Sequence, residues 1–206
     1  GRSFVVFGRS GAASTLELSA VAAGSGGFAI NGQYADDYSG CSVSGAGDVN
    51  GDGLADVVIG AQYASPGGLN KAGCSYVVFG RSGTASVELS AISAGIGGFA
   101  IKGPSTLDYS GCSVSAAGDV NGDGLGDLIV GAYSEDVGGR IDVGCSYVVF
   151  GRSASTAVEL SAVTLGRGGF AINGQCGGDR SGYSVSAAGD VNGDGLADLI
   201  VGSELG

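Results

Sequence analysis

The nine-residue stretch Asp48-Val49-Asn50-Gly51-Asp52-Gly53-Leu54-Ala55-Asp56 decides how this chain is built, because it occurs three times. It returns at 119–127, with glycine in place of Ala55, and at 190–198, and each step is 71 residues. Oxygen-bearing side chains stand at positions 1, 3, 5 and 9, and glycine stands at position 6. A short loop with this pattern is typical of a Ca²⁺ site. The sequence therefore predicts a repeat protein that binds three Ca²⁺ ions per chain.

In each loop we expect three aspartates and one asparagine to donate side-chain oxygens, and the leucine to donate its backbone carbonyl. The alternative is a metal-free turn, because Asp, Asn and Gly favour turns in any case. Three converging carboxylates without a cation would repel one another, which favours the metal site. The candidate ligands are Asp48, Asn50, Asp52, Leu54 and Asp56 in the first loop, Asp119, Asn121, Asp123, Leu125 and Asp127 in the second, and Asp190, Asn192, Asp194, Leu196 and Asp198 in the third.

Around these loops the chain divides into units of four short segments rich in Val, Ile, Phe and Tyr and bounded by Gly or Ser. In the first complete unit they lie at 41–47, 54–60, 74–80 and 98–103. This composition is typical of β-strands. The run 76–79 is apolar on both faces, which predicts sheets that are covered on both sides, as stacked blades are. The segment 86–92 could be one helical turn or a short extra strand, and we expect an irregular, partly helical connection.

The order of the segments predicts three four-stranded blades. Two are complete, at 41–103 and 112–174, and the third is split between 183–206 and 1–32. A split blade is typical of circular propellers, yet propellers close with four to eight blades. We therefore expect two chains to exchange ends in a six-bladed ring, three chains to make a larger ring, or the chain to be a piece of a longer array.

The combination of Val78-Phe79-Gly80, Gly60-Ala61-Gln62 and the metal loop resembles the FG-GAP repeat, the blade unit of the integrin alpha-subunit propeller. Closely similar units occur in bacterial surface and secreted proteins. The resemblance covers essentially the whole chain. It implies an all-β fold, a β-propeller of four-stranded antiparallel blades, with Ca²⁺ held between the first and second strands. It also implies an extracellular or cell-surface location. Integrin propellers have seven blades, whereas this chain supplies three.

Composition and charge exclude several classes of partner. Glycine is abundant, at 44 of 206 residues, and 44% of the residues are hydrophobic, which indicates many tight turns around a packed core. The formal charge is −11, and three divalent ions would offset six of these charges. The nine basic residues form no stripe that could follow a phosphate backbone, so no nucleic-acid partner is expected. The apolar runs are too short for a membrane span.

The five cysteines leave two alternatives open. Cys41 and Cys74 recur as Cys112 and Cys145, and Cys176 stands outside this pattern. There is no C-x-x-C motif and no histidine, so zinc is not expected. The cysteines are either small buried thiols on strands or bridges between the first pair and between the second pair.

The absence of histidine excludes Ser-His-Asp and Cys-His catalysis. The adjacent acids 36–37 and 135–136 point to opposite faces of an extended chain, so we interpret them as solvated loop charges rather than as an acid–base pair. No catalytic residue is therefore assigned, and a non-enzymatic protein is expected.

Two functions remain after enzymes are set aside. The first is a calcium-stabilised adhesion or assembly module, whose partners are other copies of itself, in a shared propeller or filament, or a surface protein or glycan. The second is a carbohydrate-binding propeller. Its aromatic platform would come from the tyrosines near the blade loops, Tyr34, Tyr38, Tyr63, Tyr109, Tyr133 and Tyr183.

Overall fold

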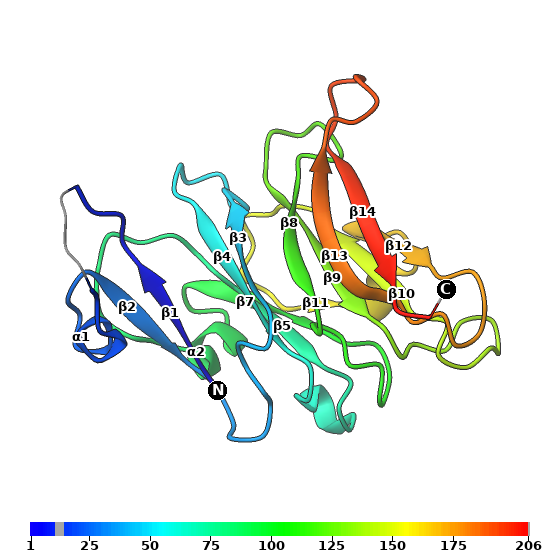
Figure 1. Ribbon diagram of the computed structural model, residues 1–206, viewed down its shortest axis with the longest axis horizontal. Helices are drawn as coiled ribbons and strands as arrows, with labels where there is room; N and C mark the ends of the chain where they lie inside the picture. The colour runs from blue at the N-terminus through cyan, green and yellow to red at the C-terminus, as the bar shows by residue number, and fades with distance from the viewer. Residues whose placement is uncertain (11–14, 206) are drawn as a thin grey trace.

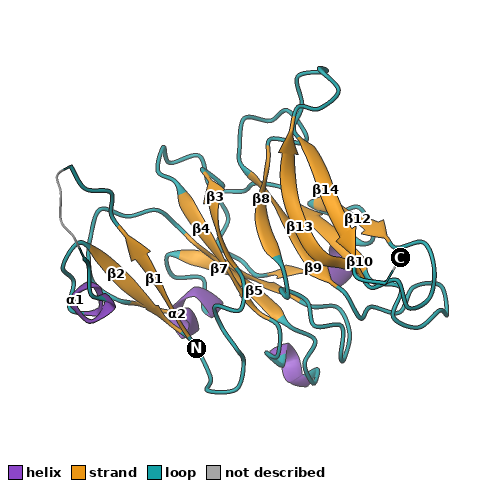
Figure 2. Ribbon diagram, in the orientation of Figure 1, coloured by secondary structure: helices purple, strands orange, loops and turns teal. Residues whose placement is uncertain are grey.

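The computed structural model describes residues 1–10 and 15–205, and short β-strands make up most of its regular structure (Figures 1 and 2). The strands are β1 (Arg2–Val6), β2 (Gly27–Asn31), β3 (Val43–Gly47), β4 (Asp56–Ala61), β5 (Cys74–Val78), β6 (Val87–Glu88), β7 (Gly98–Lys102), β8 (Val114–Gly118), β9 (Asp127–Ala132), β10 (Cys145–Val149), β11 (Val158–Glu159), β12 (Gly169–Asn173), β13 (Ser181–Gly189) and β14 (Asp198–Ser203). The short helices are α1 (Leu18–Ala22), α2 (Leu89–Ser93), α3 (Leu160–Val163) and a 3₁₀ turn at Pro66–Gly68. The expected all-β fold is confirmed.

The sequence repeat is also a structural repeat. Strands β3, β4, β5 and β7 form an antiparallel meander, and β8, β9, β10 and β12 form a second one. Val57 lies opposite Val78 in the first sheet, and Leu128 lies opposite Val149 in the second, so both strands keep the same register after one repeat. These antiparallel sheets are what FG-GAP-type blades require. The number of blades in a closed ring stays a prediction.

The core lies between neighbouring sheets rather than within one. Strands β5 and β10 are buried at every residue, as expected for strands covered on both faces. One cluster joins Val77 and Phe99 of one sheet to Leu128, Tyr147 and Leu160 of the next unit. Each buried Å² of apolar surface stabilises this stacking by roughly 25 cal/mol. Each unit therefore depends on its neighbour for its own core.

The connection between the third and fourth strands is more regular than expected. In each complete unit it consists of a two-residue strand, β6 or β11, followed by a short helix, α2 or α3. Strand β6 pairs in parallel with β2, and β11 pairs in parallel with β7, so each connection adds a strand to the sheet of the preceding unit. Adjacent sheets are thereby hydrogen-bonded to each other as well as packed.

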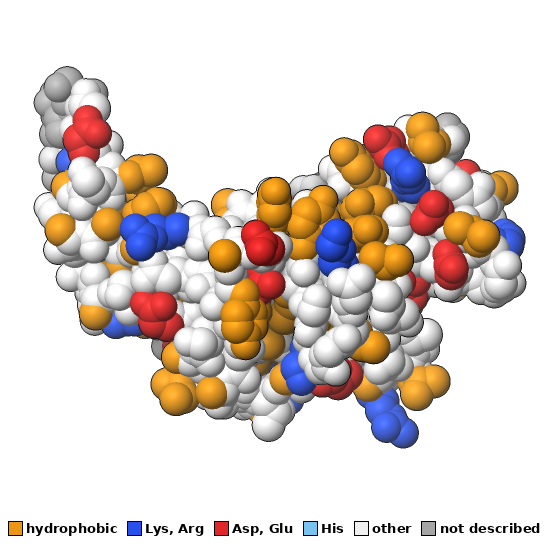
Figure 3. Space-filling view, turned by 90° about the horizontal axis from the view of Figure 1, so that it is seen from below, with side chains coloured by type: hydrophobic (Ala, Val, Ile, Leu, Met, Phe, Trp, Pro, Cys, Tyr) orange, Lys and Arg blue, Asp and Glu red, His pale blue; other side chains and the backbone are white. Residues whose placement is uncertain are grey.

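The two ends of the described chain carry half-sheets. Strands β1 and β2, with β6, lie at one end, and the hairpin β13–β14 lies at the other, where it forms a separate two-stranded sheet (Figure 1). Seen from below, the molecule is an arc whose ends do not meet, and hydrophobic side chains lie along its hollowed edge (Figure 3). Closure through a split blade is therefore not formed within one chain and stays a prediction.

All five cysteines are free thiols. Cys74 and Cys145 are buried, and burial raises the pKa of each thiol to about 12. Cys41 and Cys176 are exposed. The interpretation as buried thiols therefore holds for the pair on β5 and β10, and the structure contains neither of the two possible bridges.

One loop carboxylate is tied to the core. The Tyr147 hydroxyl of β10 donates a hydrogen bond of 2.6 Å to Glu135, which joins the loop after β9 to the strand beside it. Burial raises the pKa of Glu135 to about 7, against the smaller, lowering effect of the tyrosine hydrogen bond. Burial also raises the pKa of nearby Asp108 to about 6.

No helix in the described residues is long and apolar enough to cross a membrane.

Phe99 and Phe170 occupy equivalent positions one repeat apart, but Phe99 is fully buried and Phe170 is 40% exposed. We expect Phe99→Ala to lower the free energy of unfolding by about 3–5 kcal/mol, because it leaves a cavity between two sheets. Phe170→Ala should cost about 1 kcal/mol. Urea unfolding of the two variants, followed by circular dichroism at a concentration low enough to keep the chain monomeric, measures the difference. Equal losses would contradict a core built between units.

The raised pKa of Glu135 predicts a pH dependence. A carboxyl group whose pKa is higher in the folded state than in the unfolded state stabilises the fold when protonated. Its contribution is complete below the ordinary pKa of 4.5 and is lost as the pH rises through about 7. Glu135→Gln should flatten the stability profile in that window, as thermal melts between these pH values can show. Tyr147→Phe removes the hydrogen bond that lowers the pKa, so it should move the window to higher pH.

Candidate metal centre

The three candidate metal loops connect the first two strands of successive units. They join β3 to β4, β8 to β9 and β13 to β14, and all three project from the same edge of the arc (Figure 1). The structure thus places each predicted set of five ligands within one hairpin, as expected. The flanking elements are strands, so each loop is an EF-hand-like loop held in a β-hairpin.

The first aspartate of each loop organises the turn. One oxygen of Asp48 accepts hydrogen bonds from the backbone N–H groups of Gly51 and Asp52, at 2.7 and 3.1 Å. Its other oxygen accepts one from Gly53 at 2.8 Å. The second and third loops repeat these contacts at Asp119 and Asp190. The loop conformation is therefore held by side-chain acceptors.

The middle of the loop is held in the same way. Asn50 accepts from the Asp52 N–H at 2.8 Å and donates from its amide to the Asp52 carboxylate at 2.9 Å. The other oxygen of Asp52 accepts from the Leu54 N–H at 2.8 Å. Equivalent bonds occur in the other two loops. Asp52 is exposed and Asn50 is half-buried, so both side chains are open to an ion from solvent.

The last aspartate anchors the loop to the sheet. Asp56 is buried and accepts hydrogen bonds from the N–H groups of Val49, at 2.9 Å, and Gly80, at 2.7 Å. Burial is the largest cause of its raised pKa, and the charges of Asp52 and Asp48 raise it further. The second loop repeats the arrangement with Asp127 and the N–H of Gly151. The third differs, because Asp198 is only half-buried and the unit has no third strand of its own.

Gly80 explains why glycine ends the third strand. A Cβ on Gly80 would lie 2.5 Å from the Leu54 Cβ and 2.7 Å from the Ala55 carbonyl oxygen, closer than real Cβ atoms approach. Gly151 stands in the same relation to Leu125. The glycine backbone thus packs directly on the loop, and its N–H group donates a hydrogen bond to the last aspartate of that loop. The sequence identified Val78-Phe79-Gly80 as a motif, but it did not predict this contact across 24 residues.

The donor set fits Ca²⁺ chemically. Each loop offers three carboxylates and one amide oxygen, the hard ligands that Ca²⁺ prefers. Their oxygens are turned toward backbone N–H groups, and no group of three or more acidic or cysteine side chains within residues 1–10 and 15–205 is gathered as a metal cluster. A carboxylate oxygen that accepts one hydrogen bond keeps a lone pair for an ion. Calcium binding at these loops stays a prediction.

Neighbouring loops touch each other, which the sequence did not indicate. The Gly126 N–H donates to the Asp48 carbonyl at 2.8 Å, and the Ala197 N–H donates to the Asp119 carbonyl at 3.2 Å. A Cβ on Gly126 would lie 2.8 Å from the Ala46 carbonyl oxygen. This close approach gives a reason for glycine at that place in the second loop.

A second candidate site is a row of tyrosines at the opposite ends of the strands, four on loops and one, Tyr183, near the start of β13. Successive ring centroids are 4.8, 5.6, 5.4 and 5.6 Å apart along the row of Tyr38, Tyr63, Tyr109, Tyr133 and Tyr183. A hollow of about 360 Å³ adjoins Tyr63, Tyr133 and Tyr183. Tyr34 lies apart from the row and lines a different hollow. Five of the six predicted platform residues are therefore brought together.

Comparison with known proteins agrees with this arrangement. The FG-GAP repeat model matches residues 42–78, 113–144 and 181–206. Integrin alpha-7 of Mus musculus is 32% identical over 157 residues, and integrin alpha-3 of Cricetulus griseus is 29% identical over 156 residues. Phosphatidylinositol-glycan-specific phospholipase D of Bos taurus is 32% identical over 158 residues. Each match covers 76% of this chain but only 11%, 13% and 17% of the relative, respectively.

The family model falls on the three hairpins that carry the metal loops, and the similarity to integrin alpha subunits covers 76% of this chain. The chain belongs to the FG-GAP repeat family.

Proposed function

We propose that the chain is a non-enzymatic, calcium-stabilised adhesion module of an extracellular or cell-surface protein, with one Ca²⁺ in each hairpin loop. The observation that carries the proposal is the threefold recurrence of one oxygen donor set in one hairpin geometry. The similarity to integrin alpha subunits supports the location and the adhesion role.

The ion would supply positive charge to the three carboxylates of each loop. In the first loop Asp48, Asn50, Asp52 and Asp56 would bind it with side-chain oxygens, and Leu54 with its carbonyl. Because Asp56 is bonded to the N–H of Gly80, an ion on this loop would also fix the end of β5. The role we assign to the ion is therefore structural.

An isosteric variant of one loop should differ from the unmodified chain in how its melting temperature responds to calcium and to a chelator. Asp123→Asn keeps an acceptor for the Leu125 N–H but removes one carboxylate charge. In EGTA its melting temperature should equal or exceed that of the unmodified chain, because repulsion is reduced. Calcium should raise the melting temperature of the variant by less than it raises that of the unmodified chain. One site contributes about 2.7 kcal/mol when free calcium is a hundred times its dissociation constant, and that constant is expected on the order of 10⁻⁴–10⁻³ M.

The matched control is Asp36→Asn, which removes an exposed charge outside the loops. It should keep the full calcium-dependent shift. If the unmodified chain melts at the same temperature in calcium and in EGTA, the loops are metal-free turns and the proposal fails. Isothermal titration calorimetry with calcium gives the number of ions bound.

The tyrosine row favours a second candidate function, carbohydrate binding. Partly exposed tyrosine rings beside a hollow are suited to the apolar faces of sugar rings. Lys71 stands 5.0 Å from the Tyr63 ring centre and adds a hydrogen-bond donor next to the row. The row also crosses loops that differ between the repeats, where a scaffold usually displays its specificity.

A glycan array probed with the whole chain tests this second function. If a saccharide binds, Tyr133→Ala should remove most of the signal, because Tyr133 lies in the row and borders the hollow. Tyr34→Ala is the control, since Tyr34 is an exposed tyrosine outside the row. An array without a saccharide signal leaves protein adhesion as the function.

A further inference from the structure

The two ends of the chain expose residues whose equivalents are buried between units. Val43 on β3 is 58% exposed, whereas its equivalents Val114 and Val185 are buried. Strand β3 lies against β8 and helps to bury Val114, and β8 lies against β13 and helps to bury Val185. In the part of the chain that the structure describes, β3 has no such neighbour on its other side, because the unit before it lacks its first two strands.

The same contrast holds for residues at both ends. Leu18, next to β2, is 50% exposed, whereas its equivalents Leu89 and Leu160 are fully buried. At the other end Ile200 of β14 is 60% exposed, and its equivalent Ile129 is fully buried against Val185 of the next unit. We call Val6, Leu18 and Val43 the N-terminal surface, and Phe170 and Ile200 the C-terminal surface. These are the two halves of one repeated interface.

We propose that the N-terminal surface of one copy binds the C-terminal surface of a second copy, so that β13–β14 of one and β1–β2 of the other complete a four-stranded sheet. The register of β4 with β5 then places Leu199 opposite Val6 and Val201 opposite Phe4. A groove of about 570 Å³ between β1 and the β3–β4 hairpin is open to receive the incoming strands.

The third metal loop is incomplete without this partner. Gly80 and Gly151 donate their N–H groups to the last aspartate of the loop in their own sheet, at 2.7 and 2.8 Å. The equivalent glycine for Asp198 is Gly8, which lies at the opposite end of the chain. A Cβ on Gly8 would have nothing within 4 Å, although its two equivalents are crowded by their loops. In the assembly the Gly8 N–H of one copy donates to Asp198 of the other.

The hydrogen bonds between units form a series with a missing member. The Val114 N–H donates to the Ser42 hydroxyl at 3.0 Å, and the Val185 N–H donates to the Ser113 hydroxyl at 3.1 Å. The next pair in the series is the Val43 N–H with the Ser184 hydroxyl of the second copy. The contact between neighbouring loops continues in the same way. Gly126 and Ala197 each donate an N–H to a carbonyl of the preceding loop, and in the assembly the Ala55 N–H donates to the Asp190 carbonyl of the second copy.

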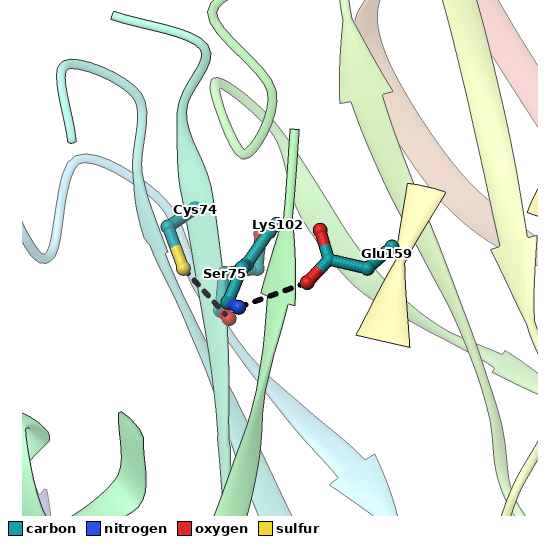
Figure 4. A network of polar contacts seen from close by, with 4 residues as sticks. All are labelled: Cys74, Ser75, Lys102 and Glu159. Carbon is teal, nitrogen blue, oxygen red and sulfur yellow. Dashed lines mark hydrogen bonds and ion pairs between the residues drawn. The ribbon is translucent and has the colours of Figure 1, made fainter. Parts of the chain in front are cut away.

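The charged contacts continue in the same way. Asn31 donates to Glu88, and Lys102 pairs with Glu159 at 2.8 Å, each time between the fourth strand of one unit and the connection of the next (Figure 4). The third member is Asn173 with Glu17 of the second copy.

Arginine stacking gives a further series. Arg81 and Arg152 lie over Phe28 and Phe99 of the preceding unit, 5.7 and 5.8 Å from the ring centres. The next member places Arg9 of one copy over the exposed Phe170 of the other. Apolar, polar and cation–π contacts thus all fit the same kind of partner, a unit of this repeat, and a second copy of this chain supplies one.

The expected assembly is a closed dimer. Each copy supplies two complete sheets and two halves, so two copies give six blades, within the four to eight that close a propeller. The contact is head-to-tail. When each copy binds the N-terminal surface of the other with its own C-terminal surface, the two contacts close a ring with two-fold symmetry. The contact itself does not rest on the proposed calcium sites, because the series of hydrogen bonds above is formed by the protein alone.

Analytical ultracentrifugation of the chain, in calcium and in EGTA, tests the contact. We expect a dimer at micromolar concentrations, and Ile200→Asp should weaken it at least about tenfold by placing a charge against Val43. Gly8→Val should do the same, because its side chain has free space in the single chain but would meet Leu196 of the partner. Ile96→Asp is the control, at a residue 68% exposed outside both surfaces. Circular dichroism verifies that each variant is folded.

A gain of affinity gives an independent test. Asn173→Lys recreates the Lys102–Glu159 pair across the contact and should tighten the dimer several-fold. Adding Glu17→Lys should reverse that gain, and Asn173→Glu with Glu17→Lys should restore it. A chain that stays monomeric at all concentrations overturns the proposal, as does a dimer indifferent to Ile200→Asp and Gly8→Val. An open polymer overturns the closed ring.

Discussion

The structure depends on the apolar core that neighbouring units share. Each sheet is made of strands of about five residues, and a sheet this small is marginal alone. Val77 and Phe99 are covered by side chains of the next unit, and the short strand β11 extends their sheet. Stability in such a chain is a sum of units and of the contacts between neighbours. A unit without a neighbour therefore exposes apolar residues, as Val43 and Ile200 do.

The positions of the main strands could be predicted from the sequence because three signals coincide there. Val, Ile and Phe cluster, glycine bounds each cluster, and the pattern returns after 71 residues. Strands β6 and β11 could not be predicted in this way. Val87 and Glu88 are two residues before a helix, too few to show a period, and their conformation is decided by the free edge of β2. Tertiary pairing, rather than local preference, makes them strands.

The candidate metal loops show the same division. The spacing of Asp48, Asn50 and Asp52 placed these residues in one turn, because only eight residues separate β3 from β4. It did not show that Asp56 also accepts a hydrogen bond from the N–H of Gly80, since that contact depends on the pairing of β4 with β5 and joins residues 24 positions apart. The sequence indicated these tyrosines as a possible platform near the blade loops, but it did not indicate the row that they form. Tyr38 and Tyr109 are repeat equivalents, but Tyr63, Tyr133 and Tyr183 come from three other positions, so repetition could not reveal that they meet.

Glycine at the joints between units ties these observations together. A Cβ on Gly60 would lie 2.1 Å from the carbonyl oxygen of Gly111 in the next unit, and one on Gly131 would lie 1.9 Å from that of Gly182. No side chain is compatible with so close an approach of two backbones. Gly202 is the third of this series, yet the nearest atom to its Cβ would be 3.5 Å away. Within one chain nothing requires glycine there. The requirement returns when the backbone at Gly40 of a second copy takes the place that Gly111 and Gly182 take at the inner joints.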